Sequence, residues 1–226
     1  METFDLFAHP AHPPLGVRRV TARVLSWDAD WCVLRWKVEG AAGVVVPGFA
    51  GAGRADGLWR ATCFELFVAR FGPGINTASA HPELVEGCAP TPAQQPCGTE
   101  VARVLRQAQD ERGGAIKLGE AYSEFNFAPS ERWAAYDFSG YRAGMTDRAM
   151  VRAPVITPRR GGDVLFCDVA IPSAIMPALP WRYALTAVIE ETGGAKSFWA
   201  PVHSGERPDF HDPACLAGVL AAPVGV

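Results

Sequence analysis

The sequence lacks several features that would place it in a large functional class. It has no apolar run near the roughly 20 residues that span a bilayer, so we expect no membrane partner. Its 21 Lys and Arg are balanced by 24 Asp and Glu, which argues against a nucleic-acid partner held through its phosphates. The first residues, METFDLFAHPAHPP, have acids and prolines where a secretory signal has a basic and then an apolar stretch. We therefore expect a cytoplasmic protein.

Metal-binding and cofactor signatures are also missing. The six cysteines include no C-x-x-C pair, and only His9 and His12 among the five histidines lie close together, with no cysteine beside them. We find no P-loop, G-x-G-x-x-G, G-x-S-x-G or H-E-x-x-H sequence. We therefore predict no metal site and no cofactor. Four cysteines are expected to be buried free thiols, and Cys88 and Cys97 are expected in a loop.

Glycine, proline and short runs of Val, Phe, Trp and Tyr are what the chain has in quantity. Short apolar runs separated by turn residues predict an all-β sandwich or barrel, and the absence of long helical periodicity argues against βαβ units. The expected strands are 20–27, 31–39, 62–71, 122–128, 133–138, 164–171, 182–191 and 196–202.

One segment, at about 72–119, is polar, Pro-rich and weakly aromatic. Its TEVARVLRQAQDER stretch has helical spacing, and the rest is typical of a loop. HPELVEG (81–87) and LRQAQD (105–110) are compatible with opposite strands of one inverted DNA repeat, as when a bacterial palindromic repeat element lies inside a reading frame. The alternative is an ordinary surface loop with one helix. We favour an insertion, since so long a connection is uncommon, and predict one domain over 1–226 that it interrupts.

The two strands that flank this segment carry polar groups with the same alternation. In TCFELFVA, Glu65 points away from Phe64 and Leu66, and in YSEFNFA, Glu124 and Asn126 share a face. If the strands pair, Glu65 lies near both of these residues. A solvated outer sheet face is the alternative, because alternation alone produces one.

Two tryptophans favour a binding site. Trp59 lies in the loop that enters the first of these strands, and Trp199 lies in the last strong strand, near Lys196 and His203. Indole rings beside a polar sheet face stack on the apolar faces of sugar rings, while nearby polar side chains bind the hydroxyls. Core packing is the alternative for each tryptophan.

Four segments carry a family resemblance: LWRATCFELFVA, YSEFNFAPSERWAAYDFSGYRAGM, WRYALTAVIEETGGAKSFWAPVH and RPDFH. They resemble the DOMON-like proteins related to carbohydrate-binding module family 9, over most of the chain outside the 72–119 segment. The resemblance implies an antiparallel β-sandwich, of jelly-roll or immunoglobulin-like type, that holds a sugar between two tryptophans.

The resemblance also implies roles for single residues. Trp59 and Trp199 stand for the aromatic pair, Glu65 for a strand glutamate that bonds sugar hydroxyls, and Asn126 for the second-strand amide. Glu124 stands where those modules carry an arginine, which reverses the charge there. We therefore predict non-catalytic binding of a small carbohydrate or sugar-like ligand.

SEFNFAP followed by SERW predicts a strand that runs into a hairpin turn at Pro129 and Ser130. Arg142 lies beyond the second strand of this hairpin, and we expect it to pair with an acid such as Glu65 or Glu124, because a buried lone carboxylate is costly. The complete predicted ligand-binding set is Trp59, Glu65, Glu124, Asn126, Arg142, Trp199 and His203.

Two other functions stay open. A retaining glycosidase would use Glu65 and Glu124 as direct cross-strand neighbours, at the carboxyl separation of about 5–5.5 Å that this mechanism needs. A haem-binding DOMON domain would use Met145 with His203 or His211.

Overall fold

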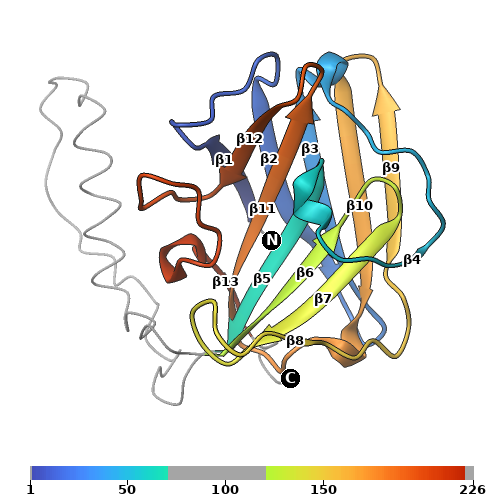
Figure 1. Cartoon of the computed structure of the whole chain (residues 1–226). Helices are drawn as coiled ribbons and strands as arrows, with labels where there is room; N and C mark the ends of the chain where they lie inside the picture. Colours follow the sequence, from blue (N-terminus) through green and yellow to red (C-terminus); the bar gives the residue numbers. More distant parts are fainter. Residues whose placement is uncertain (1, 71–120, 222–226) are drawn as a thin grey trace, which may run out of the picture. The chain divides into compact units, whose positions relative to one another are not determined.

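The computed structural model describes residues 2–70 and 121–221 of the chain (Figure 1). Within these residues there is no α-helix, and the regular structure consists of strands and four short 3-10 helices. The all-β class predicted from the sequence is confirmed. The segment at about 72–119, its expected helix, its two loop cysteines and its inverted-repeat origin lie outside the described residues.

The strands form two layers of hydrogen-bonded neighbours that are joined through β1. The first sheet has the order β1 (Thr3–Ala8), β2 (Arg19–Trp27), β3 (Trp31–Glu39), β10 (Val164–Pro172) and β9 (Val155–Gly161). The second sheet has the order β12 (Ala195–Ala200), β11 (Trp181–Glu191), β5 (Cys63–Arg70), β6 (Tyr122–Phe127), β7 (Arg132–Phe138) and β4 (Gly53–Arg54). Two short strands complete it, β8 (Thr146–Asp147) beside β7 and β13 (Gly218–Leu220) beside β11. The 3-10 helices are η1 (Ala41–Gly43), η2 (Leu58–Arg60), η3 (Ser173–Ile175) and η4 (Pro213–Cys215).

The hydrophobic core lies between the two sheets, which face one another in Figure 1. Trp36 of β3 contacts residues of the opposite sheet, with ring-centroid distances of 5.5 Å to Phe64 of β5 and 6.2 Å to Phe127 of β6. Burial of each such side chain stabilises the fold by about 1.5–3 kcal/mol. Because β1 pairs with both β2 and β12, the sheet is continuous and curls over this core as a sandwich.

Every described strand pairing is antiparallel except that of β4 with β7. The sequence AlaProSerGlu between β6 and β7 forms the hairpin turn that its proline and serine predict. The Ala128 N–H donates to the Arg132 carbonyl at 2.9 Å, and Glu131 has a φ of 67°. This turn places the side chains of β6 and β7 in fixed register.

Four described cysteines are buried free thiols, as the sequence predicts: Cys32, Cys63, Cys167 and Cys215. In the part of the chain that the structure describes, no helix is long and apolar enough to cross a membrane.

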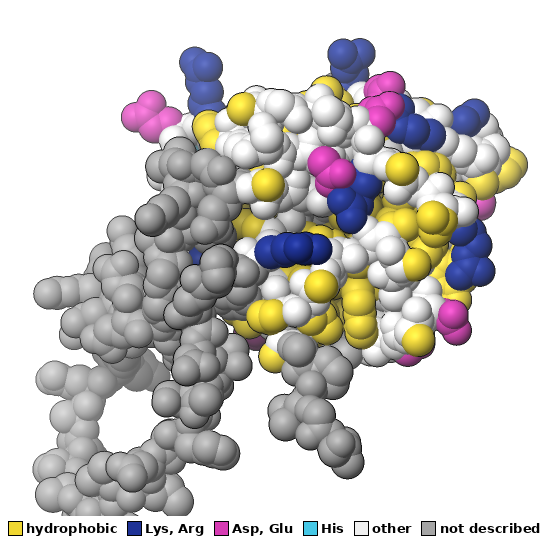
Figure 2. Space-filling view, turned by 90° about the horizontal axis from the view of Figure 1, so that it is seen from below, with side chains coloured by type: hydrophobic (Ala, Val, Ile, Leu, Met, Phe, Trp, Pro, Cys, Tyr) yellow, Lys and Arg dark blue, Asp and Glu magenta, His cyan; other side chains and the backbone are white. Residues whose placement is uncertain are grey.

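Charged side chains on the outer face of the first sheet form ion pairs within and between strands. Arg35 donates two hydrogen bonds to Asp168, at 2.6 and 2.7 Å, and the Lys37 ammonium lies 2.7 Å from the Glu39 carboxylate. On the end of the sandwich seen in Figure 2, Lys and Arg side chains are likewise scattered among Asp, Glu and hydrophobic side chains. The second sheet differs, because its outer face carries polar groups that are buried.

Candidate functional site

The side chains of β5 alternate between the core and the outer face of the second sheet. Phe64 and Leu66 belong to the core cluster, so Cys63, Glu65 and Phe67 point to the opposite side. All of them are buried, and Glu65 is only 3% exposed. The outer face is therefore not a solvated surface at this strand, which removes the alternative that alternation alone suggested.

The register of β6 against β5 brings the predicted polar residues together. Asn126 is the direct partner of Glu65, whereas Glu124 is opposite Phe67 and so lies diagonally from Glu65. Glu124 is 5% exposed. On the outer flanks, Thr186 of β11 is opposite Glu65, and Tyr136 of β7 is opposite Glu124. The convergence of Glu65, Glu124 and Asn126 is therefore as the sequence predicts.

The two carboxylates receive few hydrogen bonds from the described residues. Asn126 Nδ2 donates to Glu124 Oε1 at 2.6 Å, and the Thr186 hydroxyl donates to Glu65 Oε2 at 3.3 Å. Cys63 Sγ lies 3.9 Å from Asn126 Oδ1 as a weak donor. One N–H of Asn126 and the hydroxyl of Thr186 are thus already engaged, and most of the remaining polar atoms of this group are acceptors.

Burial raises the pKa of both glutamates. The pKa of Glu65 lies well above 4.5, first because burial disfavours its charged form and then because Glu124 is close, against a smaller opposing effect of the Thr186 bond. The pKa of Glu124 is also raised by burial, although the Asn126 bond and the charge of Arg142 act against it. Two desolvated carboxyls this close to one another resist double ionisation.

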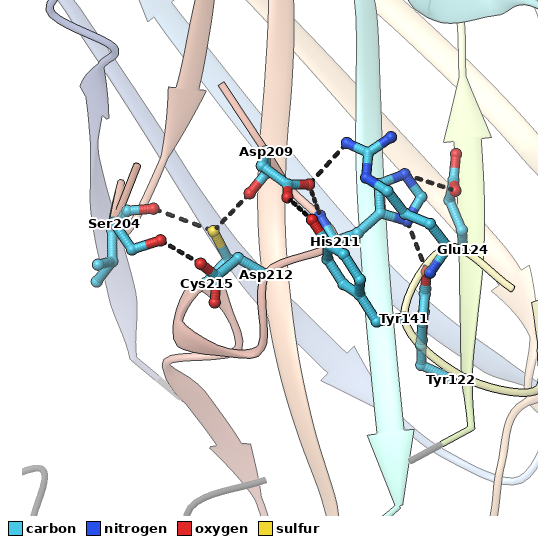
Figure 3. Close-up of polar contacts among 10 residues, drawn as sticks. Tyr122, Glu124, Tyr141, Ser204, Asp209, His211, Asp212 and Cys215 are labelled. Carbon is cyan, nitrogen blue, oxygen red and sulfur yellow. Dashed lines mark hydrogen bonds and ion pairs between the residues drawn. The ribbon is translucent and has the colours of Figure 1, made fainter. Parts of the chain in front are cut away.

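A loop from residue 201 to 217 covers one side of this face, and His211 is the residue that reaches Glu124 (Figure 3). His211 Nδ1 lies 2.7 Å from the Tyr122 hydroxyl, and Nε2 lies 3.8 Å from Glu124 Oε2. Burial, aided by the charge of Arg142, lowers the pKa of His211 to about 4. The imidazole is therefore neutral at pH 7.

Asp209 links the 201–217 loop to the turn after β7 through hydrogen bonds. Its carboxylate accepts from the Tyr141 hydroxyl and from Arg142 Nη2, the latter at 2.7 Å (Figure 3). Arg142 is thus paired with an acid, and that acid is Asp209. The expectation of a direct pair with Glu65 or Glu124 is wrong, because the guanidinium is held by the loop, and its charge acts on Glu124 only at longer range.

Trp59 lies on the opposite side of the face, on η2. This 3-10 helix contacts β5, β6 and β7, and the Trp59 ring packs against the edge of Tyr136 at a centroid distance of 6.4 Å. The Tyr136 hydroxyl donates to Asp56 at 2.6 Å, and Gly57, with a φ of 71°, supplies the left-handed residue that begins η2. The Trp59 side chain remains 41% exposed, so it marks the solvent boundary of the polar group.

Trp199 does not face this site, and its assignment is wrong. It is 4% exposed, it belongs to the core cluster, and its indole N–H donates to the Ser197 hydroxyl at 2.8 Å. Its cross-strand partner Ala187 is also a core residue, whereas Phe198 takes the opposite face. The second aromatic residue expected from the family resemblance is therefore absent from this position.

His203 is also placed apart from the glutamates. Its Nε2 lies 2.9 Å from the Phe7 carbonyl, and its ring contacts His9 at a centroid distance of 4.8 Å. These contacts hold the loop to β1, and they give His203 no hydrogen bond to Glu65, Glu124 or Asn126 among the described residues.

The geometry also bears on the two alternative functions. Glu65 and Glu124 are diagonal neighbours, so the expected direct cross-strand pairing behind the glycosidase hypothesis is wrong. Met145 is 58% exposed, while His211 and His203 are engaged with Tyr122 and with the β1 backbone. Within residues 2–70 and 121–221, no group of three or more His, Cys, Asp and Glu is arranged to hold a metal ion.

The ligand-binding set predicted from the sequence omits several residues of the site: Thr186, Tyr136, Tyr122, His211 and Asp209. Alternation places Tyr122 on the face of Glu124 and Asn126, and His211 was considered only as a haem ligand. Thr186 and Tyr136 share the outward parity of their strands, and this signal is readable once the strand pairing is known. His211 and Asp209 lie in an irregular loop that has no periodicity to interpret.

Comparison with solved structures finds a similar chain: a carbohydrate binding module of family 9 from Caldicellulosiruptor kristjanssonii, in complex with glucose. The sequence identity is 7%, the match covers 87% of this chain and 73% of the module, and the TM-score is 0.38. No protein-family profile and no curated protein match the chain.

Proposed function

We propose that the outer face of the second sheet binds a small carbohydrate without converting it. The observation that carries this proposal is the burial of Glu65 and Glu124 on a face that also presents an exposed indole. Burying a carboxylate costs several kcal/mol unless donors compensate it. The described donors are one amide and one hydroxyl, so a ligand rich in hydroxyl groups supplies what the face lacks.

A sugar matches both parts of the site. Its hydroxyls donate to carboxylates in charge-assisted bonds, which are stronger than neutral ones. The C–H face of its ring packs on an aromatic side chain, and Trp59 offers such a surface beside Tyr136. The buried acceptors can therefore bind the hydroxyls of a saccharide while the exposed indole packs against the C–H face of its ring.

The state of the carboxyls favours binding over catalysis. A retaining glycosidase needs one carboxyl held protonated as the acid and one held ionised as the nucleophile. Here burial raises the pKa of both Glu65 and Glu124, whereas that mechanism needs the pKa values of its two carboxyls to be driven apart.

Calorimetric titration with glucose and other neutral monosaccharides tests the proposal with two tryptophan variants. Trp59→Ala should lower affinity by about tenfold or more, the scale of losing an aromatic contact at a binding site, with the melting temperature unchanged. Trp199→Phe is the matched control, because that ring packs in the core. Trp199→Phe should lower the free energy of unfolding, but by less than the roughly 3–5 kcal/mol that truncation of this ring to Ala would cost. It should leave the affinity within about twofold of the native value.

The opposite pattern would contradict the proposal. If Trp59→Ala binds as well as the native protein, the exposed indole takes no part in binding. If the native protein releases nitrophenol from a nitrophenyl glycoside, and Glu65→Gln abolishes the release, the site is catalytic.

A further inference from the structure

We propose that the ligand of this face is an amino sugar, bound through its ammonium group between Glu65 and Glu124. This inference rests on the proposed function and deepens it. It follows from counting the charges, donors and acceptors that the described residues bring to the face.

Two arginines beside the face are paired with other acids. Arg142 is paired with Asp209, with a guanidinium-to-carboxylate distance of 2.7 Å. Arg54, beside Tyr136, is paired with Asp56 at 2.9 Å and with Asp147. Neither arginine forms an ion pair with Glu65 or Glu124, so the charge of these two carboxyls is left for the ligand.

His211 does not supply the missing charge. Its Nδ1 is engaged with the Tyr122 hydroxyl, and its Nε2 stands 3.8 Å from Glu124, beyond hydrogen-bond distance. The lowered pKa of about 4 keeps the ring neutral at pH 7. The imidazole therefore borders the carboxyl pair without neutralising it.

The donor and acceptor inventory separates an ammonium from a hydroxyl. Asn126 Nδ2 already donates to Glu124, Thr186 already donates to Glu65, and the Tyr136 hydroxyl donates to Asp56. What remains on the two adjacent strands is the second N–H of Asn126 and a larger number of acceptor oxygens. A hydroxyl has one proton to donate and also needs a donor for its own lone pairs, whereas an ammonium has three protons and no lone pair. The site is thus more complementary to an ammonium.

The coupled glutamates support the same conclusion. Burial raises the pKa of both Glu65 and Glu124, and the charge of Glu124 raises that of Glu65 further, so the pair retains a proton more readily than an isolated carboxyl. A bound cation stabilises both ionised forms and lowers their pKa values. Binding should therefore release a proton from the pair to the solvent.

Calorimetric titration of the full chain with four sugars tests this inference. Glucosamine, at a pH where its amine is protonated, should bind at least about tenfold more tightly than glucose. N-acetylglucosamine retains the ring but has no charge, and glucuronic acid carries the opposite charge, so both should lose this gain. Repeating the glucosamine titration in two buffers of different ionisation enthalpy should show proton release that glucose does not cause.

Two variants assign the effect to residues. Glu124→Gln and Glu65→Gln should each bring the ratio of glucosamine to glucose affinity close to one. Glu206→Gln is the control, because Glu206 is an exposed acid elsewhere on the 201–217 loop and its removal should leave the ratio unchanged. Melting temperatures check that each variant is folded.

The outcomes separate the two proposals. If glucose binds at the Trp59-dependent site and glucosamine binds no more tightly, the inference is wrong and the proposed function stands. If glucosamine is preferred but the preference survives both glutamine variants, the ammonium lies elsewhere and the inference is wrong. If no sugar binds, both proposals fail.

Discussion

Phe198 and Trp199 are consecutive residues of β12, so their rings lie on opposite faces of the second sheet. An aromatic residue at each parity gives no sequence signal for which ring faces the core. Glu65 was predictable because its neighbours Phe64 and Leu66 are apolar at the other parity, which fixes the orientation of the strand. At the residue scale, the site could therefore be read from the glutamates and the amide, but not from the tryptophan in β12.

His211 and Glu65 should give the stability of the protein two opposite pH dependences. Folding lowers the pKa of His211 from 6.5 to about 4. Between pH 6.5 and 4, the imidazole is therefore protonated in the unfolded chain but neutral in the folded protein. Stability is thus lost as pH falls from about 6.5 to 4, by on the order of 3 kcal/mol. The raised pKa of Glu65 has the opposite sign, and stability declines as pH rises above 4.5.

Denaturant unfolding between pH 4 and 8 measures both effects. His211→Asn should flatten the loss on the acid side, and Glu65→Gln should flatten the decline on the neutral side and raise stability there. If either variant gives a curve parallel to that of the native protein, the corresponding group does not titrate as its surroundings indicate.

At the scale of elements, eight expected strands are present, and their bounds agree with the structure to within two residues. Five of the described strands were not predicted; β4, β8 and β13 have only two or three residues, whereas β1 and β9 are longer and were missed for different physical reasons. β9 contains Pro158, which is compatible with a strand at the sheet edge but weakens the sequence signal. β1 stands next to a Pro-rich segment, and its role in joining the two sheets depends on long-range pairing that local sequence does not encode.

The pairing of β5 with β6 predicts that the long connection between them is dispensable. Ala69 is directly opposite Tyr122, so the two strands end side by side as in an ordinary hairpin. Replacing residues 71–120 with a four-residue linker that has Asn-Gly at its centre should leave the fold intact. It should also reduce the entropy cost of loop closure by about 2 kcal/mol. Thermal unfolding of the shortened chain checks this, and loss of a cooperative transition would show that the segment is structural.

At the scale of the whole molecule, the two sheets have outer faces of different character. The outer face of the first sheet carries ion pairs that range from exposed, as in Arg19–Asp5, to partly buried, as in Arg35–Asp168. The outer face of the second sheet carries buried carboxyls between η2 and the 201–217 loop. The net charge of -3 does not reveal this difference. The proposed binding site therefore depends on where the polar groups are buried, which composition alone could not predict.

The seven tryptophans offer the most direct test of the claim that this face binds a sugar. Nitrogen-15 NMR resolves their indole N–H groups, and single Trp→Phe variants assign the signals of Trp59, Trp199 and Trp36. On addition of a monosaccharide, the account predicts a concentration-dependent shift of the Trp59 signal, while the core signals of Trp199 and Trp36 stay fixed. A sugar that binds by calorimetry but leaves the Trp59 signal in place would contradict it.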